Sequence, residues 1–126
     1  MPATVVIGAG QAGASLVAKL RALGDTGRIT LIGEEPVPPY QRPPLSKKYL
    51  LGEMSLERLF LRPESFYAEN GIDLHLAETA VAIDRADKVV IAGGRSIAYD
   101  RLALTTGAVP RRLPGRIGGE LAGVHV

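Results

Sequence analysis

Short apolar runs rich in β-branched residues stand out in the first third of the chain and predict buried strands. The first run, TVVIG, covers residues 4–8, and the second, RITLI, covers residues 28–32. Between them, three leucines spaced four and three residues apart predict a helix over residues 14–23, which Gly24 ends. Strand, turn, helix and strand in about 30 residues make one βαβ unit, which we place at residues 3–33.

The middle of the chain, residues 34–70, combines a proline-rich loop with shorter helical patterns. The loop ends in two adjacent prolines, which are tolerated in the first turn of a helix because the N–H groups there have no partner anyway. We therefore expect a helix over residues 45–51, and Pro63 opens a second helical pattern. The alternating run IDLHL then predicts a short strand at residues 72–76.

From residue 78 the pattern changes to short strand-like runs separated by turn signals. The runs TAVAID, KVVIA and SIAYD predict a small antiparallel β-meander over residues 78–100. RLALTTG predicts a buried return strand at residues 101–106, and the Gly- and Pro-rich remainder has no period. These elements predict an α/β fold, a Rossmann-like three-layer domain with an added meander. A doubly wound domain has more strands than this, so we expect residues 1–126 to be the N-terminal portion of a larger domain.

The composition narrows the classes of function before any motif is considered. With 46% hydrophobic and 22% charged residues, the chain is typical of a globular domain, and its net charge of +2 is too small to indicate nucleic acid. The absence of cysteine excludes a disulfide framework, a thiolate metal site and a redox-active cysteine pair, and it fits the cytoplasm. No apolar run approaches the roughly 20 residues of a membrane span.

The two histidines, His75 and His125, lie far apart in the sequence and predict no metal site. His75 alternates with leucines in a strand pattern, so its side chain is expected to face outward.

Gly8, Gly10 and Gly13 form the pattern GxGxxG between the first predicted strand and the first predicted helix. In such turns the first glycine allows the tight turn, the second lets the backbone approach a pyrophosphate, and the third lets helix and strand pack closely. Glu34 lies 21 residues after Gly13, where a carboxylate accepts both hydroxyls of an adenosine ribose. The structural alternative is a glycine-rich turn with a surface glutamate. The pattern does not separate FAD from NAD, because both carry the same ADP half.

The stretch PPYQRPPLSKKYL, residues 38–50, is stiff and cationic. Five of the nine prolines lie between positions 36 and 44. Proline fixes its own φ and restricts the residue before it, so Arg42 loses little entropy on ordering, and its planar guanidinium suits phosphate. Lys47 is expected one turn into the helix that follows. The alternative for both side chains is surface charge on a proline-rich loop, and Lys48 is expected to face solvent.

Together, GAGQAG, the acidic pair Glu34 and Glu35, PPYQRPPLSKKYL and LTTGAVPR resemble the N-terminal part of the FAD-dependent ferredoxin reductases. This group belongs to the pyridine nucleotide-disulfide oxidoreductase superfamily. It includes putidaredoxin reductase, the ferredoxin reductases of aromatic-ring dioxygenases and the rubredoxin reductases, with apoptosis-inducing factor as a more distant relative. The resemblance extends over the whole chain, which corresponds to the first third of a family member.

The resemblance implies that the complete protein is an NAD(P)H-dependent flavoprotein oxidoreductase. NADH would give a hydride to FAD, and single electrons would pass to an acidic iron–sulfur ferredoxin of an oxygenase system. The residues of this chain would bind FAD, whereas the NADH site would lie in the rest of its own chain. Neither nucleic acid nor a membrane is an expected partner, and the expected location is cytoplasmic.

The resemblance also implies which residues contact FAD. The glycine-rich turn would hold the pyrophosphate, the two acids the adenosine ribose, and Arg42 the pyrophosphate or the ribityl region. Lys47 would reach the isoalloxazine near N5, where a cation raises the reduction potential, so it is the candidate catalytic residue. The implied cofactor-binding residues are Gly8, Gly10, Ala12, Gly13, Glu34, Glu35, Arg42, Lys47, Ala80, Thr105, Thr106 and Gly107.

One departure from the family pattern is Thr105, which stands where relatives have alanine and still allows the backbone turn. The alternatives are an inactive truncated nucleotide-binding module, or an FAD oxidoreductase of the rubredoxin reductase or apoptosis-inducing factor type. A flavin disulfide reductase is disfavoured because no cysteine pair follows the second strand. A single-domain NAD dehydrogenase would need a catalytic acid/base pair, and none is visible.

Overall fold

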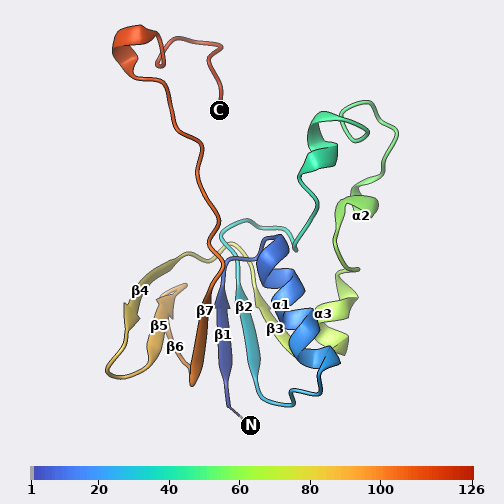
Figure 1. Ribbon diagram of the computed structural model, residues 1–126, viewed down its shortest axis with the longest axis vertical. Coiled ribbons are helices and arrows are strands. Elements are labelled where there is room, and N and C mark those ends of the chain that lie inside the picture. Colours follow the sequence, from blue (N-terminus) through green and yellow to red (C-terminus); the bar gives the residue numbers. More distant parts are fainter. Residues whose placement is uncertain (1) are drawn as a thin grey trace.

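The fold is described from a computed structural model, which defines residues 2–126. Its main sheet has four parallel strands in the order β3-β2-β1-β7, and a second sheet is an antiparallel meander in the order β4-β5-β6 (Figure 1). The strands are β1 (Thr4–Ile7), β2 (Ile29–Ile32), β3 (Ile72–His75), β4 (Ala80–Asp84), β5 (Val89–Ala92), β6 (Arg95–Ala98) and β7 (Arg101–Leu104). The helices are α1 (Gln11–Ala22), α2 (Leu56–Leu59) and α3 (Ser65–Glu69), with 3-10 turns η1 (Pro43–Ser46) and η2 (Gly115–Ile117).

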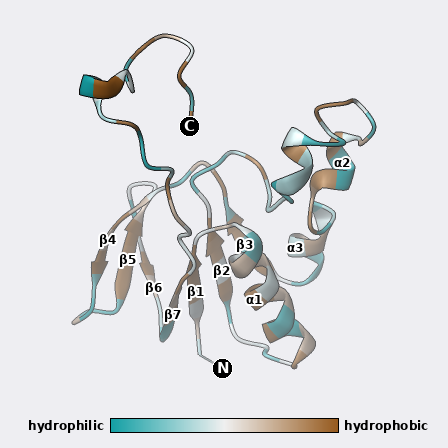
Figure 2. Ribbon diagram, turned by 45° about the horizontal axis from the view of Figure 1, so that its top comes forward, coloured by the Kyte–Doolittle hydropathy of each residue, from teal (hydrophilic) through white to brown (hydrophobic). Residues whose placement is uncertain are grey.

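The parallel sheet is the middle of three layers, because β1 and β2 are buried on both faces. On one face, Val6 and Leu31 share an apolar cluster with Val17 of α1 and Tyr67 of α3. On the other face, Val5, Ile7 and Ile32 pack with Val90, Ala92 and Ile97 of the meander. Neighbouring residues of a strand point to opposite faces, so both faces of an all-apolar strand must be covered. Figure 2 shows these strands as the hydrophobic centre of the molecule. The predicted α/β three-layer class is confirmed.

The predicted βαβ unit is confirmed, with one change at its helix. Helix α1 begins at Gln11, three residues earlier than the leucine pattern indicates, because Gly10 already serves as its N-cap. Leu23 lies beyond the last helical residue and is 72% exposed, so it is not part of the apolar face. Gly24 follows with φ 86°, the left-handed conformation that commonly ends a helix.

The helix predicted over residues 45–51 is wrong. The two prolines do open a helical turn, but this turn is the short 3-10 helix η1, and at Lys47 the backbone leaves the helical region with φ −132° and ψ −116°. Isolated turns continue to Gly52 (φ 74°). None of residues 45–51 is buried, and a helix this short is marginal without an apolar face packed against a core.

The return strand β7 was predicted to be buried, and this is wrong: none of its four residues is buried, and the first and last are exposed. β7 pairs with β1 only, and Leu104 is 62% exposed. Within residues 2–126 no strand pairs with the other edge of β7, so that edge and the Leu104 side chain stay at the surface. Beyond β7 the chain runs away from the sheet in an extended path to η2 (Figure 1). Among the described residues, no helix has both the length and the apolar character that crossing a membrane requires.

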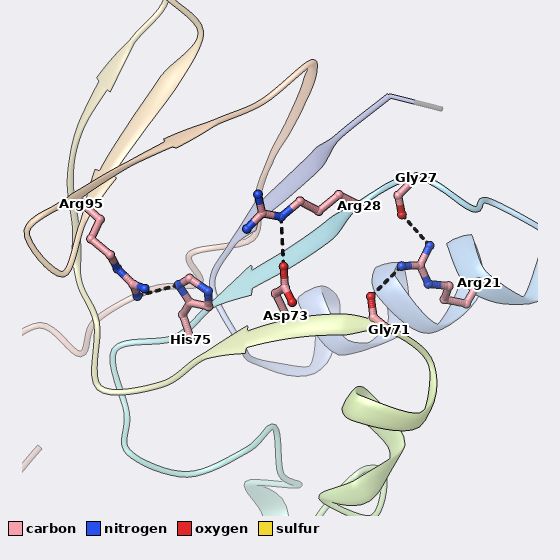
Figure 3. A network of polar contacts seen from close by, with 7 residues as sticks. All are labelled: Arg21, Gly27, Arg28, Gly71, Asp73, His75 and Arg95. Carbon is pink, nitrogen blue, oxygen red and sulfur yellow. Dashed lines mark hydrogen bonds and ion pairs between the residues drawn. The ribbon is translucent and has the colours of Figure 1, made fainter.

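Arg21, in the last turn of α1, joins two connections at the amino end of the sheet, the α1–β2 loop and the α3–β3 turn (Figure 3). Its Nη1 atom donates to the carbonyl oxygens of Asp25 at 2.7 Å and Gly27 at 2.8 Å. Its Nε and Nη2 atoms donate to Asn70 at 2.7 Å and Gly71 at 2.8 Å, in the turn between α3 and β3. One side chain thereby satisfies four carbonyl groups that no regular element pairs.

Replacing Arg21 by methionine should lower the free energy of unfolding by about 3 kcal/mol, because hydrogen bonds from a charged donor are lost together. The matched control is Arg28→Met, which removes an exposed ion pair to Asp73 (3.0 Å) and should cost no more than about 1 kcal/mol. Urea unfolding of both variants measures the difference. Equal losses in the two variants would contradict the role assigned to Arg21.

Tyr67 of α3 is buried in the core, and no residue among 2–126 is a hydrogen-bond partner of its hydroxyl group. Burial raises the pKa of Tyr67 above its ordinary value near 10, although the charge of Arg62 acts in the opposite direction. The folded chain therefore keeps this proton at a pH where the unfolded chain releases it. The stabilisation is complete below pH 10 and is lost as the pH rises through the raised pKa.

The variant Tyr67→Phe should be at least as stable as the wild type at pH 7, by up to about 1 kcal/mol, since an unpaired buried hydroxyl is removed. Its stability should also fall less between pH 9 and pH 11, in the window that Tyr67 controls. Urea unfolding at the two pH values measures both effects, with Tyr49→Phe as the surface control. A variant that loses stability at pH 7, or follows the wild type at high pH, would argue against this assignment.

Candidate functional site

A cavity of about 580 Å³ opens at the carboxyl ends of β1, β2 and β7. Ligands of parallel α/β sheets bind at this edge, because the loops that leave the strands gather there. The walls come from four segments: the turn from β1 to α1, the loop after β2, the start of β4 and the turn after β7. The residues that line it include Gly8, Gly10, Gln11, Ala12, Glu34, Glu35, Tyr40, Arg42, Glu78, Thr79, Ala80, Thr105, Thr106 and Gly107.

The three glycines of GxGxxG have different steric roles in the structure. Gly8 has φ 112°, and a Cβ atom there would lie 2.1 Å from the carbonyl oxygen of Thr105. A Cβ atom on Gly13 would lie 2.1 Å from the carbonyl oxygen of Gly8. In contrast, a Cβ atom on Gly10 would meet nothing within 4 Å and would project into open space at the cavity wall. Gly8 and Gly13 are therefore needed for packing, whereas the missing Cβ of Gly10 leaves open space at the cavity wall.

The amino end of α1 supplies hydrogen-bond donors to the cavity. The helix begins at Gln11, and no side chain caps it. Its first N–H groups have no acceptor within the helix, and the helix dipole adds a partial positive charge at this end. Gln11 and Ala12 line the cavity, so this end can bind an anion.

Glu35 gathers two polar side chains of the proline-rich loop. The Tyr40 hydroxyl donates to Oε2 of Glu35 at 2.7 Å, and Nη2 of Arg42 donates to Oε1 at 2.9 Å. The Arg42 guanidinium also lies 5.7 Å from the centre of the Tyr40 ring. The hydrogen bond to Glu35 is the main reason that the pKa of Tyr40 is raised, and burial adds to it. Glu34 also lines the cavity, but among residues 2–126 it takes part in no side-chain hydrogen bond or ion pair.

Thr105 ties the end of β7 to the glycine-rich turn. Its Oγ1 atom lies 2.9 Å from the carbonyl oxygen of Gly8 and 3.2 Å from that of Ile7, and its N–H group donates to Ile7 at 2.8 Å. An alanine could not make the hydroxyl contacts. Thr106 and Gly107 follow directly at the cavity wall, and Gly107 has φ 70°.

The cavity brings together most of the residues that the sequence indicates, but Gly13 and Lys47 are not among them. Gly13 is buried beneath the turn, as its packing role requires. Lys47 is exposed, and its Nζ atom donates to the carbonyl oxygen of Pro43 at 3.3 Å. The contacts that these residues would make with a ligand stay predictions.

Several wall residues were not predicted from the sequence to contact a cofactor, among them Tyr40, Glu78 and Thr79. A signal existed for Tyr40, because it stands two residues before Arg42 in the same stiff loop. Nothing in the sequence marks Glu78, whose partners come from distant segments.

The prediction that His75 faces outward is wrong. Its Nδ1 atom accepts a hydrogen bond from Nη2 of Arg95 at 3.0 Å (Figure 3). The same atom lies 3.3 Å from Oε2 of Glu78. The side chain is only 16% exposed, with Glu78 and Arg95 of the meander beside it. Arg95 also donates to the other carboxylate oxygen of Glu78. Among residues 2–126, no group of three or more His, Asp or Glu side chains could hold a metal ion.

The parallel sheet, the glycine-rich turn and the cavity at the sheet edge define an α/β chain of the Rossmann-like class. The family model for pyridine nucleotide-disulphide oxidoreductases matches residues 2–126, so the chain belongs to this family.

Curated relatives and solved structures agree with this assignment. The chain is 46% identical over 124 residues to a probable ferredoxin reductase of Castellaniella defragrans, and this match covers 96% of the chain and 30% of the relative. It is 47% identical over 123 residues to a rubredoxin-NAD(+) reductase of Pseudomonas putida, covering 97% of the chain and 32% of the relative. A crystal structure of the covalent putidaredoxin reductase–putidaredoxin complex matches with a TM-score of 0.86 at 43% identity, over 90% of this chain and 27% of that one. The chain thus spans less than one third of the length of these relatives.

The steric difference between the glycines predicts opposite results for two variants. Gly8→Ala should prevent stable folding, because the methyl group would overlap the Thr105 backbone at a positive φ. Gly10→Ala should change the free energy of unfolding by less than about 1 kcal/mol, since φ is −93° and the space is open. Thermal unfolding followed by circular dichroism distinguishes the two. A folded Gly8→Ala chain, or an unfolded Gly10→Ala chain, would show that the turn is held differently.

Proposed function

We propose that residues 1–126 form the N-terminal portion of an FAD-binding domain, and that the cavity holds the ADP half of FAD. One observation carries this proposal. The cavity joins an uncapped helix end, an open position at Gly10 and a carboxylate without a partner, Glu34. These are the three features that a dinucleotide requires for its pyrophosphate and its adenosine ribose.

The residues present fit this cofactor. The N–H groups at the start of α1 would bind the pyrophosphate, and the missing Cβ of Gly10 would allow its approach. Glu34 would accept the ribose hydroxyls, which suits its lack of another partner. Arg42 would bind a phosphate or the ribityl region, with Glu35 and Tyr40 holding the guanidinium at the cavity wall. The start of β4 at Ala80 and the turn Thr105 to Gly107 would border the cofactor.

The complete protein is proposed to be an NADH-dependent ferredoxin reductase of an oxygenase system. When bound, FAD supplies the chemistry: it takes a hydride from NADH and releases single electrons to an acceptor. The proposed acceptor is an acidic iron–sulfur ferredoxin, supported by the similarity to a reductase crystallised with putidaredoxin. Lys47 is proposed to approach the flavin ring. Among residues 2–126 its exposed side chain has one hydrogen bond, to the Pro43 carbonyl. The NADH site would lie in the rest of the protein, and the cytoplasmic location stays a prediction.

The purified chain should bind FAD, and this binding tests the proposal directly. Gly10→Ala and Arg42→Gln should each weaken FAD binding at least about tenfold. The added methyl group of Gly10→Ala would fill the approach to the pyrophosphate, and Arg42→Gln would remove charge-assisted hydrogen bonds. Titration followed by quenching of flavin fluorescence measures the dissociation constants. Lys48→Gln, which changes an exposed cation of the same loop, is the control and should stay within about twofold. A folded wild-type chain that binds no FAD would refute the proposal.

The chain alone should show no NADH-dependent reduction of a ferredoxin, because it spans less than one third of its relatives. Addition of NADH to the FAD-loaded chain should leave the flavin absorbance near 450 nm unchanged. Bleaching of that band at a catalytic rate would show that these residues also contain an NADH site. The matched positive control is chemical reduction by dithionite, which bleaches any bound flavin.

A further inference from the structure

The charges on the cavity wall do not suit an anion unless they are compensated. The charged side chains that line the cavity are Glu34, Glu35, Glu78 and Arg42, which is three carboxylates against one guanidinium. A pyrophosphate carries further negative charge, and like charges at short distance are repulsive. If the cavity binds a dinucleotide, a positively charged group outside the wall must therefore offset part of this negative charge.

Two of the three carboxylates have cationic partners. Glu35 is paired with Arg42 within the wall. Glu78 is paired with Arg95. Arg95 does not line the cavity, but its side chain extends from the start of β6 to the Glu78 carboxylate. The Glu78 side chain is only 19% exposed, so its charge is poorly screened by water and depends on this partner. Of the three, Glu34 alone has no cationic partner among residues 2–126, and the ribose is proposed to bind there.

The fold places Arg95 against Glu78 through a glycine turn. Gly93 and Gly94 have φ values of 56° and 71° and connect β5 to β6 directly before Arg95. A Cβ atom on Gly93 would lie 2.7 Å from the Glu78 carboxylate, so the turn packs directly on that group. The N–H group of Glu78 donates to the carbonyl oxygen of Gly33 at 2.9 Å, which fixes Glu78 beside Glu34.

The His75 ring lies beside both Arg95 and Glu78. Its Nδ1 atom is 3.0 Å from Nη2 of Arg95, a group that can only donate, and Oε2 of Glu78 has no hydrogen-bond partner among residues 2–126. Arg95 is therefore the group that compensates the Glu78 carboxylate. Its guanidinium also contacts the His75 ring, as Figure 3 shows.

We propose that Arg95 is a positioning residue for dinucleotide binding that acts through Glu78, by cancelling a wall charge that would otherwise repel the pyrophosphate. This inference rests on the proposed function. If Arg95 only held the meander against the sheet, its contribution would be the same for any ligand. The effect of its loss on FAD binding would then not depend on salt.

Titrations of the folded chain with FAD at about 20 mM and about 500 mM salt separate the two roles, because salt screens a charge effect. Arg95→Gln should lower the affinity for FAD about fivefold or more at low salt, and its difference in affinity from the wild type should shrink at high salt. Adding Glu78→Gln to Arg95→Gln should return the affinity to within about twofold of wild type, since the uncompensated charge is gone. Arg85→Gln, an exposed arginine of the β4–β5 turn, is the matched control and should have no effect.

Arg95→Lys keeps the charge and should bind FAD within about twofold of wild type. A loss as large as that of Arg95→Gln would overturn the proposal, as would a double variant that stays weak at both salt concentrations. Arg95→Gln with wild-type affinity at low salt would overturn this inference alone and leave the proposed function intact. A folded wild-type chain without FAD binding would overturn both.

Discussion

The close backbone contact between Gly8 and Thr105 is the constraint on which the cavity depends. The turn after β1 has to pass directly beside the end of β7, and only a residue without Cβ can take φ 112° so near the Thr105 carbonyl. This contact lets α1 begin at Gln11 and aim its first N–H groups along the sheet edge. Gly13 extends the same contact into the helix, where it packs on the Gly8 carbonyl. The Thr105 hydroxyl then holds the turn through oxygens of β1 and Gly8, which an alanine at this position would not do.

The same edge is completed by a layer that carries no part of the Rossmann pattern. The meander packs its apolar side against the sheet face opposite α1 and brings the start of β4 to the cavity. Burial of apolar surface orders this layer, and the Gly93–Gly94 turn brings one cation, Arg95, to a nearly buried carboxylate. Apolar packing thus decides where the meander lies, and the ion pair decides which charge the cavity presents. The two effects meet at Glu78, between β3 and β4.

The proline-rich loop is held at its base rather than along its length. Pro38 and Pro39 are buried, and Tyr40 forms a bridge with Phe60 through backbone contacts on both sides of it. Beyond Arg42 the chain loses contact with the core, and residues 45–51 lie at the surface. The stiffness of the prolines therefore serves Arg42, which stays at the cavity wall with Glu35. It does not extend to Lys47, whose side chain lies outside the wall.

The sequence by itself determined the βαβ unit, the glycine-rich turn, the acid after β2 and the meander, because each is encoded by neighbouring residues. Apolar runs, a glycine pattern and short turns act over a few positions, and the structure places these elements within a few residues of the prediction. Only the tertiary structure decided the fate of residues 45–51, the exposure of Leu104, and the partners of His75 and Glu78. Those outcomes depend on which surfaces are covered and on pairs 17 to 20 residues apart, such as Arg95 with Glu78 and His75. No local pattern reports such pairs, because the contact exists only after the meander has packed on the sheet.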